Sequence, residues 1–148
     1  MKKQLDRSFI GRKYDPVIFN VTEERIKLFA EATGQTDPIY YDLNYAKREG
    51  YSSLLAPPTF LTTVAYEQED PYKYIRDLNI NMGRFLHANQ EYSYFLKVYG
   101  GDTIKMYQEI GDIFDKKDGQ LQFIVFKSTY LNQNEKIVAK AKSTLVVR

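Results

Sequence analysis

Hydrophobic and polar residues follow two different periods along this chain, a helical one in the first half and an alternating one in the second. Over residues 23–33 the apolar side chains recur at the three-to-four-residue spacing of an amphipathic helix. Thr22 can cap the start of this helix, and Gly34 can adopt the left-handed conformation that often follows a helix end. We therefore predict a helix over 23–33, an aperiodic loop over 35–45 and a helix of one to two turns over 44–50.

A later segment is apolar on nearly all sides of a helix. Residues 54–66 read L-L-A-P-P-T-F-L-T-T-V-A-Y, and the prolines Pro57 and Pro58 are tolerated only at a helix entrance. This pattern predicts a buried helix over 59–67. A weaker helical pattern covers residues 72–78.

Strand-forming residues dominate the rest of the chain. Turn signals of the types G-G-D, K-K-D-G and N-Q-N-E separate four segments rich in Val, Ile, Tyr and Phe: 89–96, 103–114, 120–131 and 136–147. These segments predict four consecutive antiparallel strands. In the last one, Ala139 and Ala141 fall on one face and Lys140 on the other, so the sheet has an apolar face that needs a cover. The helix over 59–67 is the natural cover, which predicts the α+β class, a curved antiparallel sheet wrapped around a central helix in one domain over 1–148.

Composition narrows the classes of function. A chain of 148 residues with 43% hydrophobic residues can bury one ordinary core. Its 21 basic and 19 acidic residues nearly cancel, so we expect neither nucleic acid nor a membrane surface as a partner. The absence of cysteine excludes disulfides, thiolate metal ligands and a thiol nucleophile, and a single histidine argues against a zinc site. We expect no metal and no cofactor.

The first residues, M-K-K-Q-L-D-R-S, are charged and precede no long apolar run. This pattern differs from that of a signal peptide or a spanning helix. A chain without cysteine also suits a reducing compartment, and we expect a soluble cytoplasmic protein.

Three stretches carry recognisable motifs. They are F-I-G-R-K-Y with the V-T-E-E-R-I-K-L-F-A-E-A-T-G helix, Y-S-S-L-L-A-P-P-T-F-L-T-T over 51–63, and L-H-A-N-Q-E-Y-S-Y-F-L-K-V-Y-G-G-D-T-I over 86–104. In this order they resemble the MaoC-like hydratases and dehydratases of the hot-dog fold, specifically their N-terminal, or A-type, subunits. The resemblance implies a hot-dog fold and a place in fatty acid metabolism.

The family's catalytic loop reads A-x-x-[ST]-G-D-x-N-P-[ILV]-H-x-D, and the segment A-T-G-Q-T-D-P-I-Y-Y-D over 32–42 is similar to its second part. Gln35 stands where the family has its catalytic Asp, Asp37 where it has Asn, and Tyr40 where it has its catalytic His. The resemblance therefore implies that both halves of the acid–base pair are absent. A glutamine cannot act as a general base, and a tyrosine starts from a pKa of about 10.

The resemblance implies a subunit of an (R)-3-hydroxyacyl-thioester dehydratase, or enoyl-thioester hydratase, that completes the acyl tunnel of a catalytic hot-dog partner. The expected ligand is a thioester of coenzyme A or of acyl carrier protein. The expected assembly is a homodimer, or a heterodimer with the catalytic subunit.

Three other functions stay open. A self-sufficient hydratase can use a displaced acid–base pair, Asp37 with Tyr40 or with His87. Hot-dog thioesterases hydrolyse acyl thioesters, and a non-enzymatic module binds them without turnover. Each candidate residue also has a structural interpretation, because Asp37 can form a turn before Pro38, Tyr40 can pack as a cover, and His87 can hydrogen-bond at a strand start.

Two groups of residues are candidates for substrate binding. The backbone amides of Thr59 and Phe60 begin the predicted central helix and can polarise a thioester carbonyl, and Gln35 and Tyr40 can contact the substrate from the loop. Four basic residues are candidates for the phosphates of the carrier: Lys47, Arg48, Arg84 and Lys97.

Overall fold

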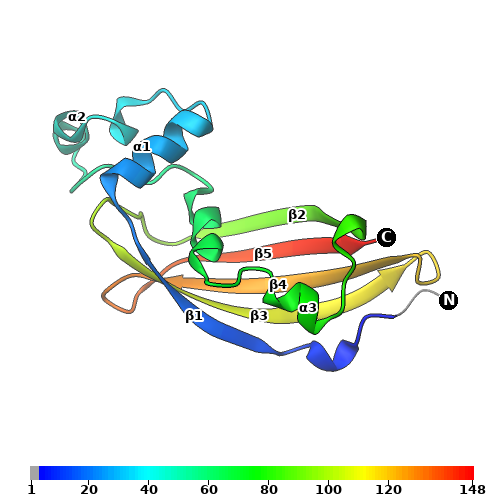
Figure 1. Cartoon of the computed structure of the whole chain (residues 1–148). Helices are drawn as coiled ribbons and strands as arrows, with labels where there is room; N and C mark the ends of the chain where they lie inside the picture. The colour runs from blue at the N-terminus through cyan, green and yellow to red at the C-terminus, as the bar shows by residue number, and fades with distance from the viewer. Residues whose placement is uncertain (1–3) are drawn as a thin grey trace.

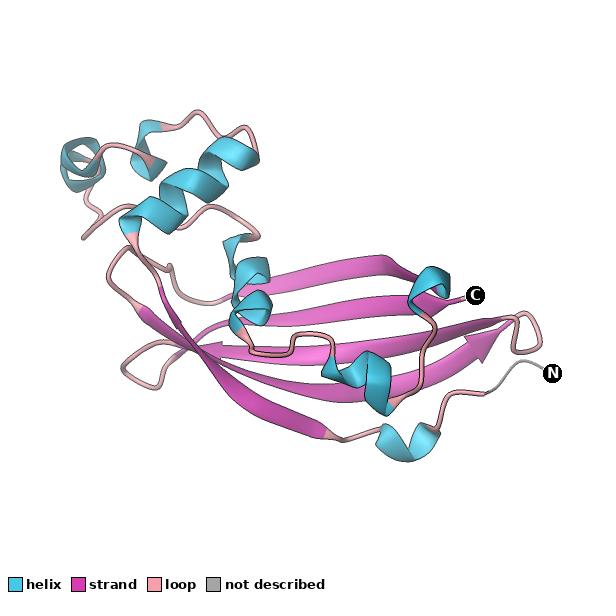
Figure 2. Cartoon of the chain, in the orientation of Figure 1, coloured by secondary structure: helices cyan, strands magenta, loops and turns pink. Residues whose placement is uncertain are grey.

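Five antiparallel strands form one sheet in the computed structural model, which describes residues 4–148 (Figure 1). The strands are β1 (Lys13–Asn20), β2 (Phe85–Tyr94), β3 (Thr103–Lys116), β4 (Leu121–Leu131) and β5 (Ile137–Val147). They lie in the order β1-β3-β4-β5-β2, so β1 and β2 are the two edges. Short helices lie over one face of the sheet and beyond one of its ends, which confirms the predicted α+β class (Figure 2).

The helical segments are short. The α-helices are α1 (Glu23–Ala32), α2 (Leu43–Arg48) and α3 (Lys73–Asp77), and the 3-10 helices are η1 (Arg7–Phe9), η2 (Pro38–Tyr40), η3 (Phe60–Glu67) and η4 (Met82–Arg84). The helices predicted over 23–33, 44–50 and 72–78 are thus confirmed, with ends that shift by one or two residues. In Figure 1, α1 and α2 lie together beyond one end of the sheet, whereas α3 lies over the face that we call the inner face.

The predicted order of four consecutive paired strands is wrong at its first junction. β3, β4 and β5 do form a meander, but β2 pairs with β5 and not with β3. The G-G-D signal belongs to a longer connection, because the amide of Gly100 donates to the Leu54 carbonyl and the amide of Gly101 to the Val21 carbonyl. These contacts lead the chain away from β2, which also begins and ends earlier than the predicted range 89–96.

The first strand, β1, is missing from the sequence prediction. It carries Pro16, which cannot donate a hydrogen bond to a neighbouring strand and therefore argues against a strand in sequence. The structure accommodates Pro16 because β1 is an edge strand and its register with β3 shifts between Tyr14 and Val17.

The central helix differs from the prediction in type. The predicted range 59–67 contains η3, a 3-10 helix that buries Phe60, Leu61 and Val64. Its hydrogen bonds span three residues: the Thr62 amide donates to the Thr59 carbonyl, and the Thr63 hydroxyl donates to the Phe60 carbonyl over 2.8 Å. Threonine side chains that bond to the backbone in this way compete with regular α-helix formation.

Packing of aromatic rings fixes η3 beside the loop that follows α1. The Phe60 ring lies edge-on to Phe19 of β1 at 5.9 Å and to Phe29 of α1 at 5.5 Å between centroids. Such edge-to-face pairs add about 0.5–1.5 kcal/mol each to the burial of the rings. These pairs hold α1, and with it the start of the loop that follows, against the start of η3.

Candidate active site

Main-chain hydrogen bonds shape the loop that resembles the catalytic segment. The Gln35 amide donates to the Ala30 carbonyl over 2.8 Å, and the Tyr41 hydroxyl donates to the Gln35 carbonyl over 2.6 Å. Both backbone groups of Gln35 are therefore engaged, while its side chain is half-buried. The loop keeps a defined shape that does not depend on an acidic side chain at position 35.

Asp37 makes the turn that its position before Pro38 suggests. Its carboxylate accepts a hydrogen bond from the Ile39 amide over 3.0 Å and caps η2. The side chain is exposed to solvent at the rim of the loop. A carboxylate in this role stabilises the loop.

Tyr40 is buried, with 9% of its surface exposed, and lines a cavity of about 300 Å³. Phe60 and Leu61 of η3 and the segment 94–98 form much of the remaining wall. Burial raises the pKa of Tyr40, and the negative charge of Asp37 and the neighbouring Tyr51 raise it further. The Tyr40 phenol therefore stays protonated near neutral pH, where it can donate a hydrogen bond but cannot remove a proton.

The two candidate amides at the start of η3 already have partners. The Thr59 amide donates to the Tyr94 hydroxyl over 3.0 Å, and the Phe60 amide donates to the Pro57 carbonyl over 3.1 Å. Thr59 has φ 66°, a left-handed conformation that is costly for a β-branched residue. Of the two amides, that of Thr59 has the more replaceable partner, because Tyr94 is a side chain with 53% of its surface exposed.

His87 lies near the start of the first long strand of the predicted set, β2, and lines a second cavity of about 250 Å³. Its Nε2 atom is 3.3 Å from Gln90 Oε1 and 3.3 Å from Ser143 Oγ. Tyr40 does not line this cavity, and His87 does not line the cavity of Tyr40. The structure therefore brings Tyr40 and Phe60 together and leaves His87 apart from them.

The four basic candidates do not form one cluster. The Lys97 ammonium lies 4.5 Å from the Tyr51 ring centroid and Lys97 lines the cavity beside Tyr40, whereas Lys47 and Arg48 belong to α2. Arg84 lies just before the start of β2, where its side chain donates a hydrogen bond to the Arg148 carbonyl. The ten residues of β2 lie between Arg84 and Lys97, and a strand of this length spans about 30 Å. Lys97 is the one of the four that borders the candidate site.

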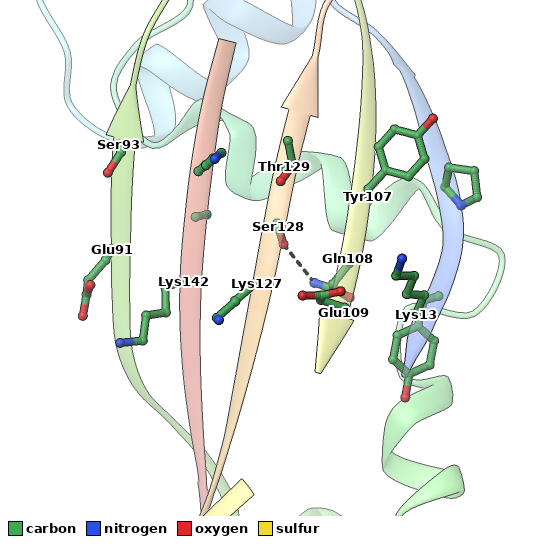
Figure 3. A pocket seen from close by; sticks show the side chains of 14 residues that line it. Lys13, Glu91, Ser93, Tyr107, Gln108, Glu109, Lys127, Ser128, Thr129 and Lys142 are labelled. Atoms are coloured by element: carbon green, nitrogen blue, oxygen red, sulfur yellow. Dashed lines mark hydrogen bonds between the residues drawn. The ribbon is translucent and has the colours of Figure 1, made fainter. Parts of the chain in front are cut away.

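The outer face of the sheet holds a larger hollow, of about 830 Å³ (Figure 3). Strand register aligns five charged side chains across it: Lys13, Glu109, Lys127, Lys142 and Glu91. The two signs alternate except where Lys127 faces Lys142. A solvated face of a one-sided sheet explains this arrangement.

Neither a metal cluster nor a membrane helix is present in the part of the chain that the structure describes. Residues 4–148 contain no group of three or more His, Asp or Glu side chains placed to hold a metal ion. No helix within this range is long and apolar enough to cross a membrane.

Comparison with known proteins decides the family. Residues 8–141 match the model described as FAS1-like, dehydratase domain region. The chain belongs to this dehydratase family. A UPF0336 protein of Saccharopolyspora erythraea, 32% identical over 145 residues, agrees over 97% of this chain and 92% of that relative.

Solved structures support the same family. This FAS1-like dehydratase chain is similar to a chain of the HadBC (3R-hydroxyacyl-ACP dehydratase) complex from Mycobacterium tuberculosis, with a TM-score of 0.78 and 26% identity over 93% of this chain and 96% of that one. A MaoC-like dehydratase gives a TM-score of 0.82 at 19% identity, over 95% of this chain and 42% of that one. The predicted hot-dog fold and the MaoC-like family are confirmed.

Several residues of the site escaped the sequence interpretation. Tyr94 meets the Thr59 amide, and Tyr92 and Tyr130 line the second cavity. Alternation along β2 was the available signal, since Gln90, Tyr92 and Tyr94 recur at every second position. The predicted strand 89–96 contains Gln90, Tyr92 and Tyr94, but the residues that contact these side chains depend on the order of the strands, which the sequence does not give.

Proposed function

We propose that this chain is a subunit of an (R)-3-hydroxyacyl-thioester dehydratase or enoyl-thioester hydratase, and that it forms part of the acyl-binding cavity for a catalytic partner. The observation that carries the proposal is the state of Tyr40. At the position of the family's catalytic histidine stands a phenol that is buried in a cavity wall and kept protonated by its surroundings.

The reaction needs two proton transfers that this loop cannot make. Dehydration removes a proton from the carbon next to the thioester carbonyl and delivers a proton to the departing 3-hydroxyl group. The Gln35 amide has no basic or acidic form near neutral pH, and the protonated Tyr40 phenol can form hydrogen bonds but cannot take up the proton. The acid–base pair therefore comes from a second hot-dog chain, while this chain supplies cavity walls and hydrogen-bond donors.

The partner surface in this proposal is the β2 edge of the sheet. β2 has unpaired backbone groups on its free side, and exposed apolar residues lie on it and just beyond it: Leu86, Tyr94, Phe95 and Leu96. An exposed edge with apolar side chains favours pairing with another chain. The similarity to a subunit of the HadBC complex supports a second hot-dog chain, catalytic or identical, as the occupant.

The cavity beside Tyr40 suits an acyl thioester in its size and lining. Its wall is mainly apolar, formed by residues such as Leu55, Phe60 and Leu61, and Lys97 stands at its border. An ammonium group there can contact the phosphates of coenzyme A or of a carrier-bound phosphopantetheine. These features support an acyl-thioester ligand.

A displaced acid–base site is a weaker candidate. Asp37 already accepts the Ile39 amide, and its charge raises the pKa of Tyr40, which opposes the ionisation that Tyr40 would need as a base. His87 lines the other cavity. This arrangement favours the partner role over a self-sufficient hydratase.

Hydration of crotonyl-CoA and of 2-dodecenoyl-CoA, followed by loss of the enoyl-thioester absorbance, tests the proposal. The full chain, shown to be folded by circular dichroism, should bind acyl-CoA in calorimetry and give no turnover. The double variant Gln35→Asp, Tyr40→His restores the family's residue types and should gain measurable hydration, with Tyr40→Phe as the inactive control. Turnover by the unmodified chain that Asp37→Asn abolishes would establish the displaced site instead. Release of free thiol would identify a thioesterase. Binding of acyl-CoA without turnover, even beside a catalytic hot-dog chain, would identify a non-enzymatic module.

A further inference from the structure

The second cavity has a polar lining on a mainly apolar inner face. It lies between η3 and the inner face of the sheet and has a volume of about 250 Å³. Elsewhere this face carries fully buried aliphatic residues such as Ile110 and Ile124. At the cavity, Ser128 and Tyr130 of β4 take such positions with exposures of 6% and 3%. Polar groups buried in this way are costly unless they have hydrogen-bond partners.

Hydrogen bonds connect part of this polar lining. The Tyr92 hydroxyl lies 2.6 Å from Thr62 Oγ1, and Gln108 Nε2 donates to Ser128 Oγ over 3.3 Å. Each hydroxyl combines one donor with two acceptor lone pairs, so these contacts leave hydrogen-bonding capacity for a bound group. The polar lining comes from η3 and from four strands, β2, β3, β4 and β5, and it converges on one space.

The donors in this cavity are neutral. Burial raises the pKa values of Tyr92 and Tyr130, so both phenols stay protonated in the physiological range. None of the residues that line the cavity is Lys, Arg, Asp or Glu. A carboxylate or a phosphate would find no lysine or arginine in this lining, whereas a hydroxyl or carbonyl oxygen finds several hydroxyl groups.

This cavity follows the cavity of Tyr40 along the same two elements. Phe60 and Leu61 of η3 line the first cavity, and the next residue, Thr62, lines the second. On β2, Tyr94 lines the first and Tyr92 the second, and their rings stack at 5.5 Å with an angle of 11° between their planes. A chain that extends from the first cavity along β2 therefore meets the polar lining of the second.

Building on the proposed acyl-thioester function, we infer that the preferred ligand is an acyl chain that carries a neutral oxygen, a hydroxyl or keto group, on its distal part. The thioester end occupies the cavity beside Tyr40. The distal oxygen binds the hydroxyl groups of Tyr130 and Ser128. This assigns the second cavity a role in choosing among acyl chains.

Calorimetric titration of the full chain tests this assignment, with saturated acyl-CoA thioesters of six to twelve carbons and their ω-hydroxy counterparts. Coenzyme A is common to both ligands, so the affinity ratio reports on the distal oxygen alone. At the length that reaches the second cavity, the hydroxylated ligand should bind roughly 3- to 10-fold more tightly, as expected for one or two net hydrogen bonds. The double variant Tyr130→Phe, Ser128→Ala should reduce this ratio to about one.

Tyr107→Phe, on the outer face, is the matched control and should keep the preference of the unmodified chain. A ratio near one at every chain length, together with clear binding of the plain ligands, overturns the inference and leaves the proposed function standing. A preference that survives in the double variant also overturns it. If neither ligand binds, the acyl-binding part of the proposed function fails, and this inference fails with it.

Discussion

The hydroxyl group of Tyr94 accepts a hydrogen bond from the backbone amide of Thr59 over 3.0 Å, although the two residues are 35 positions apart in the chain. This contact joins the edge strand β2 to the start of η3 beside the cavity of Tyr40. It also occupies the Thr59 amide, which we predict to polarise a thioester carbonyl. Tyr94 is half exposed, so a ligand can displace its hydroxyl group.

Removing the Tyr94 hydroxyl should therefore strengthen ligand binding. In Tyr94→Phe the Thr59 amide has no side-chain acceptor, so a thioester carbonyl can bind this amide without displacing a hydroxyl group. We expect the dissociation constant for a saturated acyl-CoA to fall roughly 2- to 5-fold in calorimetry, within the range of one net hydrogen bond. Tyr107→Phe, an exposed residue on the outer face of the sheet, is the control and should bind as the unmodified chain does. An unchanged or weaker affinity in Tyr94→Phe would show that the carbonyl does not use this amide.

The backbone conformation of Thr59 predicts a stabilising substitution. At φ 66° a threonine is strained by about 1–3 kcal/mol, whereas glycine adopts this region freely at an entropic cost of about 0.5–1 kcal/mol. Thr59→Gly should therefore raise the free energy of unfolding in urea by about 1 kcal/mol. Thr36→Gly, at a loop position without positive φ, should lower it. Loss of stability in both variants to the same extent would contradict the strain at Thr59.

Stability at alkaline pH should depend on Tyr130. Burial raises the pKa of Tyr130 above its ordinary value of about 10, so the folded chain keeps a proton that the unfolded chain releases. The protonated Tyr130 contributes fully to the free energy of unfolding below pH ~10. As the pH rises above this value, the free energy of unfolding falls by up to about 1.4 kcal/mol per pH unit. Urea unfolding between pH 8 and 11 should therefore show a shallower alkaline decline for Tyr130→Phe than for the unmodified chain. Parallel pH profiles of the two proteins would refute this role of Tyr130.

A charge at the β2 edge should weaken assembly. Phe95 directly follows β2 and is 57% exposed, and burying a glutamate in an apolar interface is unfavourable. We expect Phe95→Glu to weaken association with a second hot-dog chain, or with a second copy, by at least about 10-fold in light scattering or sedimentation. Ile18→Glu places the same charge on the other edge strand, β1, at a residue of 56% exposure, and should leave assembly unchanged. Weaker association of Ile18→Glu, with unchanged association of Phe95→Glu, would assign the interface to β1.

Local patterns determined much of this protein from the sequence alone. Helical spacing with a Thr22 cap defines α1, and alternation with turn signals defines β3, β4 and β5, because both signals depend on residues close together in the chain. The substitutions at Gln35 and Tyr40 are also legible in sequence, since they lie in one motif. The family could thus be inferred before the fold was known, and the absence of the acid–base pair stays a prediction.

Only the tertiary structure decided how distant segments meet. β1 was missed because Pro16 argues against a strand locally, and only an irregular edge pairing with β3 accommodates it. β2 pairs with β5, and the segment that follows β2 crosses to β3 on the other side of the sheet. Backbone hydrogen bonds from this segment to Leu54 and Val21 hold it on that path. The second cavity depends on that order, because it gathers groups from η3, β2 and β4 that lie far apart in the chain. Pairing between distant strands follows from the packing of the whole sheet, and no local pattern of residues encodes it.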